Sequence, residues 1–130
     1  MHRKAYFQNL SIEDFANFDL LCRKHFRNSF INNTNEYIIW PKHNIYFILS
    51  DVQSLTDLKC KILNWCSRSC IKGIPEHDQA RMQNFVNEFL QTDFDYDDFE
   101  TIYVVLGNGI NKDLTKKFVE SRYDLELLKI

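Results

Sequence analysis

The residues best suited to metal chemistry are the four cysteines and four histidines of this 130-residue chain. Cys66 and Cys70 are four residues apart and Cys22 and His25 are three apart, so on helices each pair would point to one side. Two such pairs on facing helices could supply four tetrahedral ligands to zinc. Because the spacing matches no standard zinc module, the favoured interpretation is that the cysteines pack in the core as small hydrophobic residues. A structural zinc is the alternative, and no other cofactor is expected.

A cluster of carboxylates is the second group with chemical potential. Its members are Asp93, Asp95, Asp97, Asp98 and Glu100. The first three aspartates repeat the start of a calcium loop, but Asp98 stands at the glycine position and Val104 at the closing glutamate position, so calcium is rejected. The cluster could cap the helix that follows, which is the favoured interpretation. It could also present spaced negative charges to a basic groove and so imitate phosphates.

Lysines form a third group near the C-terminus. Residues 95–121 could form a helix-turn-helix in which Lys112, Lys116 and Lys117 face DNA phosphates. The preceding helix, however, would begin with the carboxylate cluster, which phosphates repel. Direct DNA binding is therefore the weaker hypothesis.

No catalytic signature is found in the sequence. A phosphate loop, a G-x-S-x-G turn and a His-Glu-x-x-His pair are all missing from the chain. We therefore expect a protein that is not an enzyme.

These groups must be positioned by the elements that the apolar pattern predicts. Two apolar runs, Tyr37–Trp40 and Ile45–Leu49, flank the turn formers Pro41–Asn44, which predicts an antiparallel β-hairpin over residues 37–49. Two strands alone are marginal in water and need a helix packed on one face. The rest of the chain has helical periodicity, so the predicted fold class is α+β, mainly α, with about five helices around the hairpin.

Each predicted helix has a residue that favours a helix start. These residues are Ser11, Ser54, Pro75, Asp95 and Asn111. Gly73 is predicted to stop the second helix, and Gly107-Asn108-Gly109 the fourth. In the fourth helix the inward-facing residues are predicted to be Tyr96, Phe99, Ile102, Tyr103 and Leu106.

Length and charge set the expected organisation. A chain of 130 residues is predicted to form a single compact domain, 1–130. Residues 1–73 carry a net charge of +4 and residues 74–130 a net charge of −6, with a candidate hinge at 73–75. The start of the chain has no secretory pattern, and its longest strongly apolar run is five residues, so a cytoplasmic protein without a membrane span is expected.

The stretch Thr101–Leu128, TIYVVLGNGINKDLTKKFVESRYDLELL, resembles the C-terminal part of small uncharacterised proteins of phages and prophages of low-GC Gram-positive bacteria. In that family an aromatic–aliphatic helix precedes LGNGIN and a Leu-Thr/Cys-x-x-Phe-x-Glu-Ser helix that ends in Tyr-Asp. Trp65, Ser67-Arg68 and Lys72-Gly73 are similar to its middle helix. The family usually has Gly where Arg122 stands and lacks most of these cysteines, which argues against a zinc site common to the family.

The resemblance implies a phage origin and, with it, a class of function. Accessory phage proteins of this size often bind and block a host machine, and the class includes CRISPR inhibitors with acidic surfaces that imitate nucleic acid. We therefore expect a phage protein that inhibits a bacterial defence complex, an anti-CRISPR that acts on a type II Cas nuclease through the carboxylate cluster. The alternative is a phage DNA-binding or replication accessory protein that uses the helix-turn-helix-like region.

Overall fold

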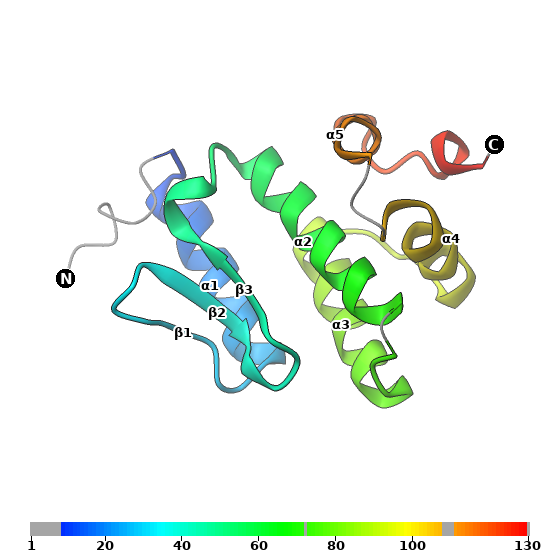
Figure 1. The fold of residues 1–130 in the computed structure, drawn as a ribbon. Coiled ribbons are helices and arrows are strands. Elements are labelled where there is room, and N and C mark those ends of the chain that lie inside the picture. The colour runs from blue at the N-terminus through cyan, green and yellow to red at the C-terminus, as the bar shows by residue number, and fades with distance from the viewer. Residues whose placement is uncertain (1–8, 72, 108–110, 130) are drawn as a thin grey trace. The chain divides into compact units, whose positions relative to one another are not determined.

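The computed structural model describes residues 9–71, 73–107 and 111–129, apart from the side chains of residues 49, 70 and 71 (Figure 1). Within these residues the chain forms five α-helices and one three-stranded antiparallel sheet. The predicted fold class, α+β and mainly α, is confirmed. The chain forms two compact units, Met1–Leu58 (the N-terminal unit) and Lys59–Ile130 (the C-terminal unit). The single domain and the hinge at 73–75 stay predictions.

The N-terminal unit begins with helix α1, Ile12–His25, which starts where the sequence predicts. The Ser11 side chain accepts a hydrogen bond from the Asp14 backbone N–H at 3.0 Å and so satisfies one of the free donors at the helix start. Acidic residues in the first turn and basic residues in the last turn complement the helix dipole.

The sheet has the order β1-β2-β3, with strands Phe30–Ile31, Glu36–Trp40 and Ile45–Ile48. Strands β2 and β3 are the predicted hairpin, and Asn44 takes the left-handed conformation, with φ of 56°, at the end of the connecting turn. Strand β1 is a finding that the sequence pattern did not predict, because two residues are too short a run to show alternation. Its turn into β2 is held by the Asn32 side chain, which accepts hydrogen bonds from the backbone N–H groups of Thr34 and Glu36.

Helix α1 lies along one face of this sheet (Figure 1). The alternation of buried and exposed residues in β3 turns Phe47 inward and Tyr46 outward. Phe18 of α1 is fully buried, with its ring centroid 5.4 Å from that of Tyr37 and 5.9 Å from that of Phe47. These aromatic contacts form the core of the N-terminal unit.

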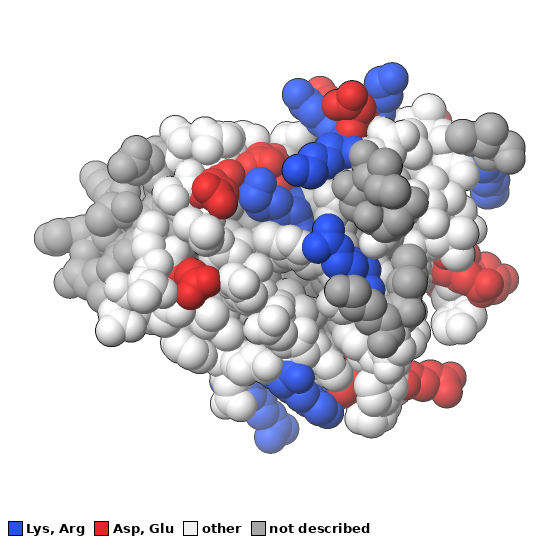
Figure 2. Space-filling model, viewed as in Figure 1, with Lys and Arg blue, Asp and Glu red and all other residues white. Residues whose placement is uncertain are grey.

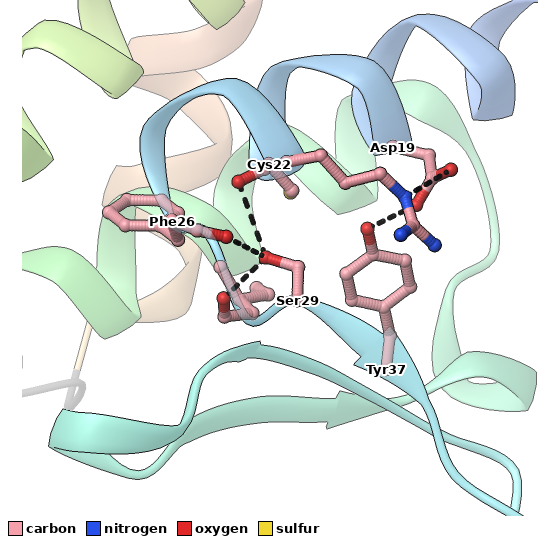
Figure 3. A network of polar contacts seen from close by, with 7 residues as sticks. Asp19, Cys22, Phe26, Ser29 and Tyr37 are labelled. Carbon is pink, nitrogen blue, oxygen red and sulfur yellow. Dashed lines mark hydrogen bonds and ion pairs between the residues drawn. The ribbon is translucent and has the colours of Figure 1, made fainter.

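A network of hydrogen bonds and an ion pair connects α1 to the sheet (Figure 3). The Tyr37 hydroxyl donates a hydrogen bond to the Asp19 carboxylate, which also forms an ion pair with Arg23 at 3.1 Å. The Ser29 hydroxyl lies within hydrogen-bonding distance of three backbone carbonyl oxygens, those of Cys22, Phe26 and Ile39. The first two carbonyls belong to the C-terminal end of α1 and the third to β2, so Ser29 links the helix end to the sheet.

Helix α2, Leu55–Ile71, crosses from the N-terminal into the C-terminal unit, which continues with α3, Glu76–Leu90, α4, Tyr96–Leu106, and α5, Lys112–Glu120. Gly73 has a φ of +90°, a backbone conformation that residues other than glycine rarely adopt. This conformation explains why α2 ends before Gly73. A short 3-10 turn, Leu125–Leu128, follows α5.

Aromatic rings form much of the core of the C-terminal unit. The Phe94 ring lies against those of Phe99, Phe118 and Tyr123, with centroid separations of 5.5, 6.3 and 6.3 Å. The Asn87 side chain fixes Phe94 by hydrogen bonds to its backbone N–H and C=O, at 2.9 and 3.0 Å. The loop between α3 and α4, which carries part of the carboxylate cluster, is therefore anchored to α3.

Candidate functional site

The four candidate zinc ligands are divided between the two units. Cys22 and His25 lie on α1, whereas Cys66 and Cys70 lie on α2 in the C-terminal unit, and the Cys70 side chain is outside the described residues. Among the side chains that the structure describes, no three of His, Cys, Asp and Glu form a group that could hold a metal ion. The zinc site stays a prediction that the described residues do not support.

Cys22 and Cys66 are both buried and neither is in a disulfide, as their interpretation as core residues predicts. The Cys22 side chain contacts the Tyr37 hydroxyl inside the N-terminal unit. Burial raises the pKa of this tyrosine well above its ordinary value, and the Cys22 and Asp19 side chains raise it further. This tyrosine therefore stays protonated in the folded chain and keeps donating its hydrogen bond.

Two members of the carboxylate cluster cap helix α4. Asp95 Oδ1 accepts a hydrogen bond from the Asp98 backbone N–H at 2.9 Å, and Asp98 Oδ2 accepts one from the Asp95 N–H at 3.1 Å. This reciprocal pair is a capping box, which satisfies the backbone N–H groups of both residues at the start of the helix. The predicted capping role is confirmed for these two residues.

The other three members are not used in this way. The side chains of Asp93, Asp97 and Glu100 are exposed, and within the described part of the chain none of them accepts a hydrogen bond or forms an ion pair. Their carboxylates therefore face solvent and are available to an external cation, although Asp97 also lies in the first turn of α4, where the helix dipole favours negative charge.

Helix α4 adds two apolar side chains to this surface, Tyr96 with an exposed fraction of 61% and Val104 with 68%. Tyr96, Glu100 and Val104 follow one another at intervals of four, so they share the outward side of the helix. We call the set Asp93, Tyr96, Asp97, Glu100 and Val104 the acidic stripe.

The prediction that Tyr96 faces inward is wrong, although the other four predicted inward residues of this helix are buried. Tyr96 is the first residue of α4, at the edge of the apolar side. Side chains of a helix tilt toward its N-terminus, so a ring at this position extends past the turn that would cover it. The periodicity alone could not reveal this end effect.

The charge balance of the units differs from that of the sequence halves. The N-terminal unit carries six Lys or Arg and six Asp or Glu, whereas the C-terminal unit carries ten and twelve. The two divisions differ because the unit boundary lies after Leu58, whereas the sequence halves divide after residue 73. The cations between these two points therefore count with the C-terminal unit. The C-terminal unit therefore combines both signs of charge, and the acidic stripe is one part of its surface.

The predicted helix-turn-helix region is present as two helices, α4 and α5, but residues 108–110 of the connecting turn lie outside the described part. Lys112, Lys116 and Lys117 are exposed on α5, as the DNA-binding hypothesis requires. The use of α5 as a reading helix stays a prediction.

The capping box gives a first testable prediction. Asp95→Ala should lower the free energy of unfolding by about 1 kcal/mol, because the backbone N–H of Asp98 loses its acceptor. Glu100→Gln, one turn later on the exposed side, should change it by less than about 0.5 kcal/mol. Urea unfolding followed by circular dichroism measures both; equal effects would show that the capping box adds no stability.

Comparison with known proteins found no matching protein-family model, no matching curated protein and no matching solved structure. Across the described ranges, no helix has both the length and the apolar character that a bilayer span requires. A function is therefore inferred from the surface chemistry of the described residues and from the resemblance seen in the sequence.

Proposed function

We propose that this chain is a non-enzymatic interaction protein that binds a cationic protein surface through the acidic stripe. The observation that carries this proposal is the set of three exposed carboxylates, Asp93, Asp97 and Glu100, that form no ion pair with any described residue. Like charges repel one another, which offsets the favourable effect of the helix dipole on Asp97. Attraction to a positive partner would repay that cost and speed the encounter.

The apolar members of the stripe support a protein as the partner. Exposed tyrosines are enriched among residues that dominate protein–protein affinity, since the ring buries a large area and the hydroxyl finds a polar partner. Tyr96 stands between Asp95 and Asp97 on the first turn of α4. A partner with Lys or Arg around an apolar pocket would match this arrangement.

The resemblance to phage proteins supports a narrower proposal about the partner. We propose a bacterial defence complex, and specifically a type II CRISPR nuclease, as the target in the cytoplasm of the host. Such nucleases hold their guide–target heteroduplex in a positively charged channel. A row of carboxylates could occupy part of that channel in place of phosphates.

The experiment compares the wild-type chain with the triple variant Asp93→Asn/Asp97→Asn/Glu100→Gln. This variant leaves the capping residues Asp95 and Asp98 intact, so α4 should remain folded. Affinity for a purified type II nuclease is measured by surface plasmon resonance at about 50 mM and about 300 mM salt. We expect the dissociation constant to rise at least about tenfold at low salt, and less at high salt because of screening.

A charge-matched control separates this surface from net charge. Glu13→Gln/Asp51→Asn/Glu120→Gln removes three exposed carboxylates from other elements and should leave the affinity within about twofold. Tyr96→Ala should weaken binding at both salt concentrations, because contact of its ring is not screened. No binding of the wild-type chain, or equal losses in both triple variants, would contradict the proposal.

A further inference from the structure

Helix α2 has a charge pattern that the proposed function does not use. Between Asp57 and Glu76 the sequence has no carboxylate, and this stretch contains four cations: Lys59, Lys61, Arg68 and Lys72. Solvated helices usually mix both signs, because opposite charges at intervals of four support each other. A purely cationic stretch of this length is the electrostatic footprint of a surface that meets an anion.

The structure places part of this stretch against α5 within the C-terminal unit. Lys61, Asn64 and Arg68 are spaced by three and four residues, so they share one side of α2. The Thr115 hydroxyl of α5 donates a hydrogen bond to the Asn64 side chain at 3.1 Å. The side of α2 that carries the cations therefore borders α5.

Helix α5 contributes lysines next to the same contact. Lys112 precedes Thr115 by one turn and Lys116 follows it directly, and both side chains are exposed. Neither lysine has a hydrogen bond or an ion pair with any residue in the described ranges. Figure 2 shows Lys and Arg side chains over α2 and α5 on the face that it presents, with Asp and Glu side chains among them. We call Lys61, Arg68, Lys112 and Lys116 the basic surface.

We propose that the basic surface binds the phosphate backbone of a nucleic acid without regard to sequence. Its cations are spread along two helices, on which the rise per residue separates the backbone positions of Lys61 and Arg68 by about 10 Å and those of Lys112 and Lys116 by about 6 Å. A polymer with a regular series of phosphates can meet all of them together. Asn64 adds an amide near the cations, and side-chain amides commonly contact phosphate oxygens.

A nucleic acid fits this surface better than an acidic protein does. Protein interfaces have apolar or aromatic anchors at their centre, whereas backbone contacts need only cations and polar donors. Every large apolar side chain that is exposed in the described residues lies outside α2 and α5. The basic surface therefore lacks the anchor that the acidic stripe has in Tyr96.

This inference goes beyond the proposed function and does not depend on it, because the two surfaces share no residue. It also differs from a helix-turn-helix that reads a duplex with α5 alone. Here α5 and α2 act together, and the contact is to phosphate rather than to base edges.

The test uses the full chain and fluorescein-labelled mixed-sequence probes, a 20-nucleotide single strand and a 20-base-pair duplex, in fluorescence anisotropy at about 50 mM salt. Arg68→Gln/Lys112→Gln/Lys116→Gln should weaken binding of the preferred probe by at least about tenfold. It should also make the slope of log K against log salt less negative by about 2–3 for a duplex. A preference between the probes tells which form of backbone is bound.

The matched control Arg27→Gln/Arg122→Gln/Lys129→Gln removes three exposed cations from other elements and should change affinity by less than about threefold. Circular dichroism checks that each variant is folded. If the triple variant is unfolded, the single variant Lys116→Gln replaces it in the binding measurement. Three results would each overturn the proposal: no salt-dependent binding by the wild-type chain, equal losses in both triple variants, or displacement of the probe by poly-glutamate at equal charge, which would indicate an acidic protein instead.

Discussion

Phe18→Ala is expected to lower the free energy of unfolding by about 3–5 kcal/mol, the largest change that we predict for a single substitution. Phe18 is fully buried between α1 and the sheet, where its ring lies against those of Tyr37 and Phe47. Truncation removes apolar area from the core and leaves a cavity that the surrounding rings cannot fill without moving. Marginal stability makes a loss of this size severe.

Leu20→Ala is the matched control, because this leucine lies on the same helix but has an exposed fraction of 66%. Its effect should stay within about 0.5 kcal/mol. Chemical unfolding followed by circular dichroism and by tryptophan fluorescence measures both variants, since Trp40 lies in the same unit and stacks on Phe26. A loss below about 1 kcal/mol for Phe18→Ala would contradict the described packing of α1 on the sheet.

The second large effect is a loss of stability at alkaline pH that depends on Tyr37. Burial raises the pKa of this phenol in the folded chain, whereas an unfolded tyrosine ionises near pH 10. Above that pH the unfolded state binds fewer protons than the folded state, so the free energy of unfolding falls as pH rises. The stabilisation is fully present below about pH 10. Ionisation of Tyr37 in the unfolded state should lower the free energy of unfolding by roughly 2–3 kcal/mol between pH 10 and pH 12.

Tyr37→Phe should make this fall with pH less steep, because the variant has no phenol at the position. At neutral pH the same variant should lose about 1–3 kcal/mol, since Asp19 keeps its ion pair with Arg23 but loses the hydroxyl donor. Tyr46→Phe, on the outer face of the sheet, is the control and should leave the alkaline slope unchanged. Urea unfolding from pH 7 to pH 11 measures the slope, and a Tyr37→Phe slope equal to that of the wild type would contradict the assignment.

Burial also raises the pKa of Tyr123, so part of the alkaline loss should remain in Tyr37→Phe. This second tyrosine packs against Phe94 and Phe118 in the C-terminal unit. Tyr123 therefore contributes to the slope that remains, whereas the part that the substitution removes is due to Tyr37.

The acidic stripe and the basic surface explain how a small net charge of −2 can accompany strong local fields. Both belong to the C-terminal unit, where the sequence separates cations on α2 from carboxylates on the first turn of α4. If both proposals hold, the chain could contact the protein and the nucleic acid of one ribonucleoprotein. The two triple variants would then weaken separate interactions, and each can fail without the other.

The sequence by itself determined where four of the helices begin. Ser11, Ser54, Asp95 and Asn111 each cap the helix that they were expected to start, because a cap needs only a side-chain oxygen and an N–H group three residues later. The hairpin of β2 and β3 follows in the same way from two apolar runs around a turn. Information of this kind is contained within a few neighbouring residues.

Only the tertiary structure decided which of these residues remain available to a partner. It added β1, whose two residues form a strand only because β2 lies beside them. It exposed Tyr96 and brought the side of α2 that carries Lys61 and Arg68 next to α5. Exposure and charge proximity depend on elements distant in sequence, so no local pattern contains them, and the candidate surfaces emerged only once the helices were packed.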